Sequence, residues 1–82
     1  MVKIVPSRHF KEMLKERAID EKRVKNVLDA PDKIEPHEDG TMHYIKKISE
    51  NGNRYLRVII NEMVIPAKGV TAFFDRRIGK KK

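Results

Sequence analysis

The chain has 82 residues and no cysteine, and its 19 lysine and arginine residues outnumber 12 acidic residues to give a net charge of +7. This length predicts one domain with one core. The lack of cysteine excludes a disulfide framework and a zinc–thiolate site. No apolar run is long enough to cross a bilayer. We therefore expect a soluble cytoplasmic protein without a signal peptide, whose basic surface suits either a polyanion or plain solvation.

Charge is unevenly distributed along the sequence. Residues 29–53 contain more acidic than basic side chains, whereas residues 1–28 and 76–82 are strongly basic. Such a dipolar chain has a field that can steer a polyanion toward one surface.

The first third of the sequence predicts a short strand followed by two helices. Val2, Ile4 and Val5, followed by Pro6, predict a short strand or an extended arm. Ser7 is placed to cap a first helix, Asp20 a second, and Pro31 ends the second helix. We expect a helical hairpin joined around Ala18–Ile19.

The remainder of the chain predicts strands. Residues 32–40 are polar and rich in turn formers, and Asn51-Gly52 is a hairpin signal between two apolar runs. Three strands are predicted, at Met42–Ile48, Arg54–Asn61 and Val70–Phe74, with a loop or a ragged strand end at 63–69. The order β-α-α-β-β-β indicates an α+β fold, an antiparallel sheet with the helical hairpin packed on one face. We assign residues 1–77 to this single domain and 78–82 to a basic tail.

Alternate residues of the predicted strand Arg54–Asn61 point to opposite faces of the sheet. Leu56, Val58 and Ile60 are expected to face the helices, so that Tyr55 and Arg57 lie on the other, open face. There Arg57 either lines an anion-binding surface or pairs with an acidic neighbour.

A basic end follows the last predicted strand. Residues 71–75 are followed at once by Arg76-Arg77 and then by the lysines 80–82. Arginine offers a planar fork for phosphate and clustered lysine a diffuse positive potential, although basic tails also serve as solubilising ends.

Short segments over nearly the whole chain carry a resemblance to a known family. They are Ser7-Arg8-His9-Phe10, Met13, Glu16-Arg17-Ala18-Ile19, Pro31-Asp32, Asp39-Gly40, Tyr44, Leu56-Arg57-Val58-Ile59 and Thr71-Ala72-Phe73-Phe74-Asp75-Arg76-Arg77. The chain resembles domain-of-unknown-function family 4258, which in turn is similar to the RelE/ParE toxin superfamily and its BrnT-type ribonuclease toxins. That family usually has glycine where this chain has Ala18, so we expect an inter-helix turn without a positive φ.

The resemblance implies metal-independent cleavage of RNA, in which the ribose 2′-hydroxyl attacks the adjacent phosphate. Such a site needs cations for the developing charge and a group that moves protons. The predicted catalytic residues are His9, Arg57 and Arg76, with His43 as another proton carrier. The predicted RNA-binding residues are Arg17, Tyr44, Tyr55, Arg77, Lys80, Lys81 and Lys82.

Each candidate has a simpler interpretation. His9 is equally an exposed or packing histidine, and Arg17 can bond a helix C-terminus or Asp32. Phe73 and Phe74 are predicted as core residues on opposite faces of the sheet. The histidines are scattered and have no obvious carboxylate partner, so we predict no metal site and no cofactor.

The leading functional hypothesis is a toxin-type RNA-binding protein or metal-independent endoribonuclease of a toxin–antitoxin system. Its expected partners are RNA, with or without the ribosome, and a small acidic antitoxin, with no membrane; the protein is expected to be a monomer or weak dimer. The alternative is a non-catalytic nucleic-acid-binding or protein-interaction module on the same scaffold.

Overall fold

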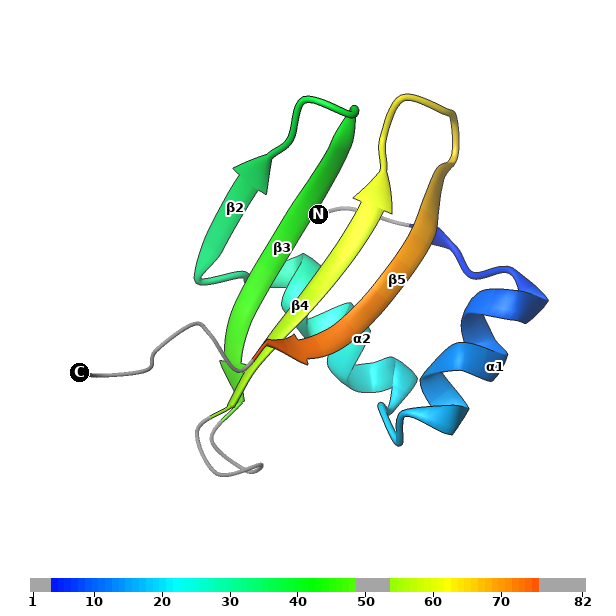
Figure 1. The fold of residues 1–82 in the computed structure, drawn as a ribbon, viewed down its shortest axis with the longest axis vertical. Helices are drawn as coiled ribbons and strands as arrows, with labels where there is room; N and C mark the ends of the chain where they lie inside the picture. Colours follow the sequence, from blue (N-terminus) through cyan, green and yellow to red (C-terminus); the bar gives the residue numbers. More distant parts are fainter. Residues whose placement is uncertain (1–3, 49–53, 76–82) are drawn as a thin grey trace.

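The computed structural model describes residues 4–48 and 54–75, which form two helices and five strands (Figure 1). The elements are β1 (Ile4–Val5), α1 (Arg8–Glu16), α2 (Glu21–Asp29), β2 (Lys33–Pro36), β3 (Thr41–Ile48), β4 (Arg54–Asn61) and β5 (Ala67–Asp75). The predicted Asn51-Gly52 turn and the basic segment 76–82 lie outside the described residues. The α+β fold is confirmed.

Both helices begin at the predicted caps. The Ser7 hydroxyl accepts a hydrogen bond from the Phe10 N–H, and the Asp20 carboxylate accepts one from the Lys22 N–H. Each bond satisfies a donor that the first helical turn leaves without an intrahelical acceptor. The caps therefore fix where the helical hairpin starts and where it turns.

The inter-helix turn differs from the prediction. Ala18 has a φ of 56°, so the left-handed conformation is present without glycine. The Ala18 N–H donates to the Lys15 carbonyl and the Ile19 N–H to the Leu14 carbonyl. These are the two bonds of a Schellman motif, which requires a left-handed residue after the helix end. The motif and the burial of Ile19 outweigh the cost of the alanine Cβ.

The sheet corrects the predicted topology in two respects. Its strand order is β1-β5-β4-β3-β2, and β1 runs parallel to β5, so the sheet is mixed and not wholly antiparallel. The segment predicted as a loop contains the extra strand β2, which pairs antiparallel with β3. β2 is a short edge strand in which two of the four residues are charged, and it ends in a proline. An edge position tolerates that composition, because one side of the strand needs no ladder partner.

The helices cover one face of the sheet, as predicted. α1 contacts β5, and α2 contacts β3 and β4, while Figure 1 views the sheet from the opposite side. Leu56, Val58 and Ile60 of β4 are fully buried beneath the helices. A Cβ on Gly69 would lie 3.0 Å from the Phe10 ring, so glycine there lets α1 pack closely on β5. We call this side the helix-covered face and the other the helix-free face.

Among residues 4–48 and 54–75, no helix is long and apolar enough to span a membrane.

Candidate functional site

The helix-free face is built from rows of side chains that the strand register brings side by side. One row contains Lys47, Tyr55 and Asp75; the next contains Lys33, Ile45, Arg57 and Phe73; the third contains Glu35, His43 and Ile59. This face therefore carries titratable groups between a few apolar side chains. The helix-covered face of the same strands is almost wholly apolar.

Arg57 lies at the centre of a charged network on this face. Its Nε donates to Asp75 Oδ2 at 2.9 Å, and its Nη1 lies 3.1 Å from Glu35 Oε1. The Arg57 side chain is 12% exposed and that of Asp75 only 2%. Burial strengthens charge-assisted hydrogen bonds of this kind and makes the loss of either partner costly. The pairing interpretation of Arg57 is therefore the one that the geometry supports.

Glu35 is shared by several cations. Its second oxygen lies 3.1 Å from Lys33 Nζ, while its first contacts Arg57. The hydrogen bond from Lys33, followed by that from Arg57, lowers the pKa of Glu35 to about 2. Glu35 is therefore a carboxylate throughout the physiological pH range.

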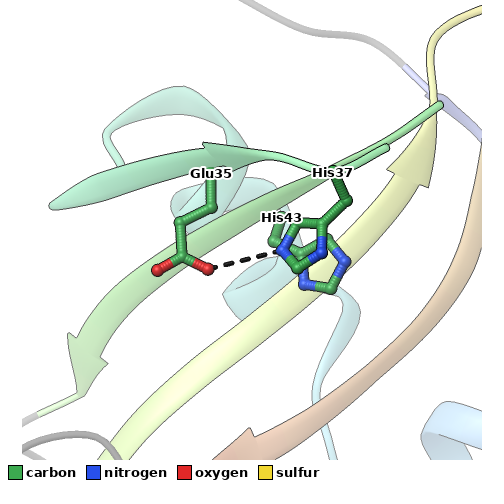
Figure 2. A group of neighbouring side chains, drawn as sticks. All are labelled: Glu35, His37 and His43. Carbon is green, nitrogen blue, oxygen red and sulfur yellow. Dashed lines mark ion pairs between the residues drawn. The ribbon is translucent and has the colours of Figure 1, made fainter. Parts of the chain in front are cut away.

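Two histidines lie beside this carboxylate (Figure 2). The rings of His37 and His43 are stacked, with centroids 3.5 Å apart and planes inclined by 14°. His37 Nε2 lies 3.5 Å from Glu35 Oε1, and Arg57 Nη1 lies 2.8 Å from His43 Nδ1. Because arginine can only donate, His43 Nδ1 accepts, and the ring carries its proton on Nε2. Burial, and then the charges of His37 and Arg57, lower the pKa of His43.

A tight hairpin between β2 and β3 positions these histidines. The His37 N–H donates to the Thr41 carbonyl, and the Asp39 carboxylate accepts from both the N–H and the hydroxyl of Thr41. Those bonds from Thr41 lower the pKa of Asp39. Gly40 has a φ of +89°, which glycine adopts without steric cost. The turn sequence thus sets the register that pairs Glu35 with His43.

Among the described residues, the two predicted catalytic residues His9 and Arg57 lie in different layers. His9 is an exposed residue in the first turn of α1, in the helical layer, whereas Arg57 lies on the helix-free face. The described partners of Arg57 are Glu35, Asp75 and His43. Arg76 lies outside the described residues, as do Arg77, Lys80, Lys81 and Lys82.

Two predicted RNA-binding residues make contacts within the domain. Tyr44 is buried on the helix-covered face, where its hydroxyl donates to Glu62, so its ring offers no face to a base. Arg17 Nη1 donates to the Thr71 hydroxyl at 3.0 Å and to the Ala72 carbonyl at 2.8 Å. It therefore ties the end of α1 to β5, and not to a helix C-terminus or Asp32. Tyr55 does lie on the helix-free face, half-buried.

Sequence reasoning missed the residues that surround Arg57. Glu35 and His37 were placed in a loop, so their approach to His43 was not foreseen. Phe74 does pack against the core as predicted, but Phe73 lies half-buried on the helix-free face beside Arg57. The signal that was present is Gly40, because a three-residue hairpin loop of residues 38–40, with glycine at its last, left-handed position, pairs Glu35 with His43.

Comparison with known protein families gives a match over most of the chain. The model of a domain of unknown function, DUF4258, matches residues 7–73 and so covers every element that forms the helix-free face except β1 and the last residues of β5. The chain belongs to the DUF4258 family. The match carries no activity with it. Comparisons with curated proteins and with solved structures each give no match.

Proposed function

We propose that this DUF4258 domain binds single-stranded RNA on the helix-free face of its sheet. The observation that carries the proposal is the row formed by Lys47, Tyr55 and Asp75. Asp75 is the last residue of β5, and the sequence continues directly into Arg76-Arg77. A half-buried aromatic ring thus adjoins the point at which the basic segment begins.

Aromatic rings and cations are the two components of sequence-tolerant binding to single strands. Stacking of a base on an aromatic side chain contributes about 1–3 kcal/mol, and cations neutralise phosphates. Tyr55 and Phe73 are diagonal neighbours on adjacent strands of this face. Together they offer two partly exposed rings, and Lys47 lies opposite Tyr55 on β3.

The charge balance assigns the phosphate contacts chiefly to the C-terminal segment. The described residues contain 13 lysine and arginine residues and 11 acidic ones, so most of the net charge of +7 resides elsewhere in the chain. Residues 76–82 hold five of the remaining cations. The proposal therefore separates a stacking surface on the sheet from an electrostatic contribution of the segment that follows it.

Fluorescence anisotropy with a labelled single-stranded RNA tests this division. Tyr55→Ala is expected to weaken binding about 5- to 150-fold, which corresponds to one lost stacking interaction. Replacing Lys80, Lys81 and Lys82 by serine should instead flatten the dependence of log K on log salt. Tyr44→Phe, a change on the helix-covered face, is the matched control and should leave affinity unchanged. Absence of RNA binding at low salt would contradict the proposal and favour a protein-interaction domain.

A second candidate function is metal-independent cleavage of the bound RNA. The contact between Arg57 and His43 favours it, because it places a proton carrier beside a guanidinium as transesterification requires. Arg57 is held by two carboxylates, so a phosphate would have to displace Glu35 from it.

Product analysis in the presence of a chelator tests cleavage. RNA incubated with the unmodified chain or with the His9→Ala variant should yield fragments that end in a cyclic phosphate. RNA incubated with the His43→Ala variant should not. A chain that binds RNA and yields no fragments would be the non-catalytic module.

The biological setting that we propose is a toxin–antitoxin pair. A basic chain of this size suits a small acidic partner that covers its RNA-binding surface. Expression of the chain should arrest growth, and co-expression of an adjacent acidic reading frame should relieve the arrest. Arrest that persists in Tyr55→Ala and His43→Ala chains would show that this surface is not the toxic one.

A further inference from the structure

We propose that Glu35, His37 and His43 bind a divalent transition metal of the Zn²⁺ class at the β2–β3 hairpin. One carboxylate oxygen and one nitrogen from each histidine lie within 4.8 Å of one another. Imidazole and carboxylate are ordinary zinc ligands, and two histidines with one glutamate form the protein part of an open, four-coordinate site. The proposal is independent of RNA binding.

The spacing of two of these ligands already suits a metal. Glu35 Oε1 and His37 Nε2 are 3.5 Å apart, as Figure 2 shows by the dashed line. Ligands at about 2.0–2.2 Å from a tetrahedral zinc ion lie roughly 3.3–3.6 Å from each other. A metal that touches both atoms therefore requires little change in the distance between them.

The hairpin limits the ordering that metal binding would require. Glu35 and His43 are paired across β2 and β3, and the bonds of Thr41 to His37 and Asp39 close the turn between them. His37 is 40% exposed, so a metal can approach from solvent and retain a water ligand. Ligands held in this way lose little conformational freedom on binding.

Arg57 is the competitor of the metal at this site. Its Nη1 contacts two of the three ligand residues, at Glu35 Oε1 and His43 Nδ1. The His43 tautomer that accepts from Arg57 has its Nδ1 lone pair available, so a metal can replace the guanidinium there without a change of tautomer. Arg57 would retain its hydrogen bond to Asp75.

The ring stack must open slightly on binding. Imidazole lone pairs lie in the ring plane, so two nearly parallel rings do not aim at one point. One of the two rings, His37 or His43, therefore has to tilt. We expect the His37 ring to move, because it is exposed, whereas His43 lies within β3 and is half-buried.

Titration of the full chain with ZnCl₂ in a calorimeter, after removal of metals, tests the site. We expect one ion per chain, and His37→Ala should weaken binding by at least about tenfold. Glu35→Gln should weaken it similarly, whereas His9→Ala, which removes an exposed histidine outside the hairpin, is the matched control. Substitution of Co²⁺ should give the strong visible absorption of a four-coordinate ion, and His37→Ala should abolish it.

The competition between Arg57 and the metal for Glu35 and His43 can be measured separately. Arg57→Lys keeps a cation near Asp75 but shortens the side chain, so Zn²⁺ should bind this variant more tightly than the unmodified chain. Equal weakening by His9→Ala and His37→Ala, or no binding in the calorimeter, would overturn the proposal. Neither result depends on whether the chain binds RNA.

Discussion

Strand β4 presents two chemically different surfaces through alternate residues. Toward the helices it directs Leu56, Val58 and Ile60, all fully buried in one apolar cluster. Toward the opposite side it directs Tyr55 and Arg57, the second of which is tied to two carboxylates. The first surface is stabilised by apolar area removed from water, the second by hydrogen bonds that offset the desolvation of charge.

This contrast supports our proposal that the helix-free face is the binding surface. A closely packed apolar face needs no partner beyond the helices. A face with a buried arginine, paired acids and two histidines costs free energy to assemble and yields less stability than an apolar replacement would. Groups of that kind gather at functional sites more often than elsewhere.

Removal of the arginine should give the largest effect. Arg57→Leu takes away the guanidinium that contacts Asp75, whose side chain is 2% exposed. The free energy of unfolding measured in urea should fall by about 3–5 kcal/mol. Lys33→Leu, which removes a cation that is 66% exposed, should cost less than about 1 kcal/mol. Similar values for the two variants would show that the network adds no more than a surface ion pair.

Truncation of the core tests the other surface. Leu56→Ala should lower the free energy of unfolding by about 2–5 kcal/mol, because it removes a fully buried side chain and leaves a cavity. Ile59→Ala changes a half-buried residue on the helix-free face and should cost clearly less. If Ile59→Ala proved the more costly, the assignment of the two faces would be wrong.

A substitution in the inter-helix turn should increase stability, whereas the preceding variants decrease it. Ala18→Gly removes the Cβ that a φ of 56° disfavours, and should raise the free energy of unfolding by about 1 kcal/mol. Ala30→Gly is the control, since Ala30 has a φ of −142° and gains nothing from glycine. A loss of stability in Ala18→Gly would contradict the left-handed conformation.

Tyr44 is expected to have the smallest effect on the free energy of unfolding near neutral pH, because its contribution changes only at high pH. Burial, and then the hydrogen bond to Glu62, raise the pKa of Tyr44 from 10.0 to about 12. Between these values the unfolded chain loses the phenol proton while the folded chain keeps it, so stability falls as pH rises. Urea unfolding from pH 9 to 12 should show a steeper decline for the unmodified chain than for Tyr44→Phe. Parallel declines would remove Tyr44 as the cause.

Much of the fold could be predicted because local signals agree with the tertiary structure. Ser7 and Asp20 are side chains that cap helices, and the alternation in Arg54–Asn61 fixes which residues face the core. β2 could not be found in this way, because an edge strand with polar residues has no apolar period to detect. The parallel pairing of β1 with β5 joins the two ends of the described chain, and no local pattern encodes it.

The candidate site was predicted less completely than the fold. Arg57 and Tyr55 were placed on the open face from alternation alone. The partners of Arg57 come from β2, β3 and β5, and the register of those strands depends on turns and tertiary packing. His43 and Tyr44 illustrate the difficulty. A shift of one residue in the register of β3 would place Tyr44 beside Arg57 and bury His43 beneath the helices.

The edge position of β2 has a consequence for how the central guanidinium meets solvent. β2 has a ladder partner on one side, in β3, so separation of this strand removes Glu35 from Arg57 without disturbing the apolar cluster. Such partial opening costs less free energy than complete denaturation. Amide hydrogens that bridge β2 and β3 should therefore exchange sooner than those between β4 and β5. While β2 is separated from β3, an incoming anion would reach the Arg57 guanidinium, whose charge Glu35 otherwise neutralises.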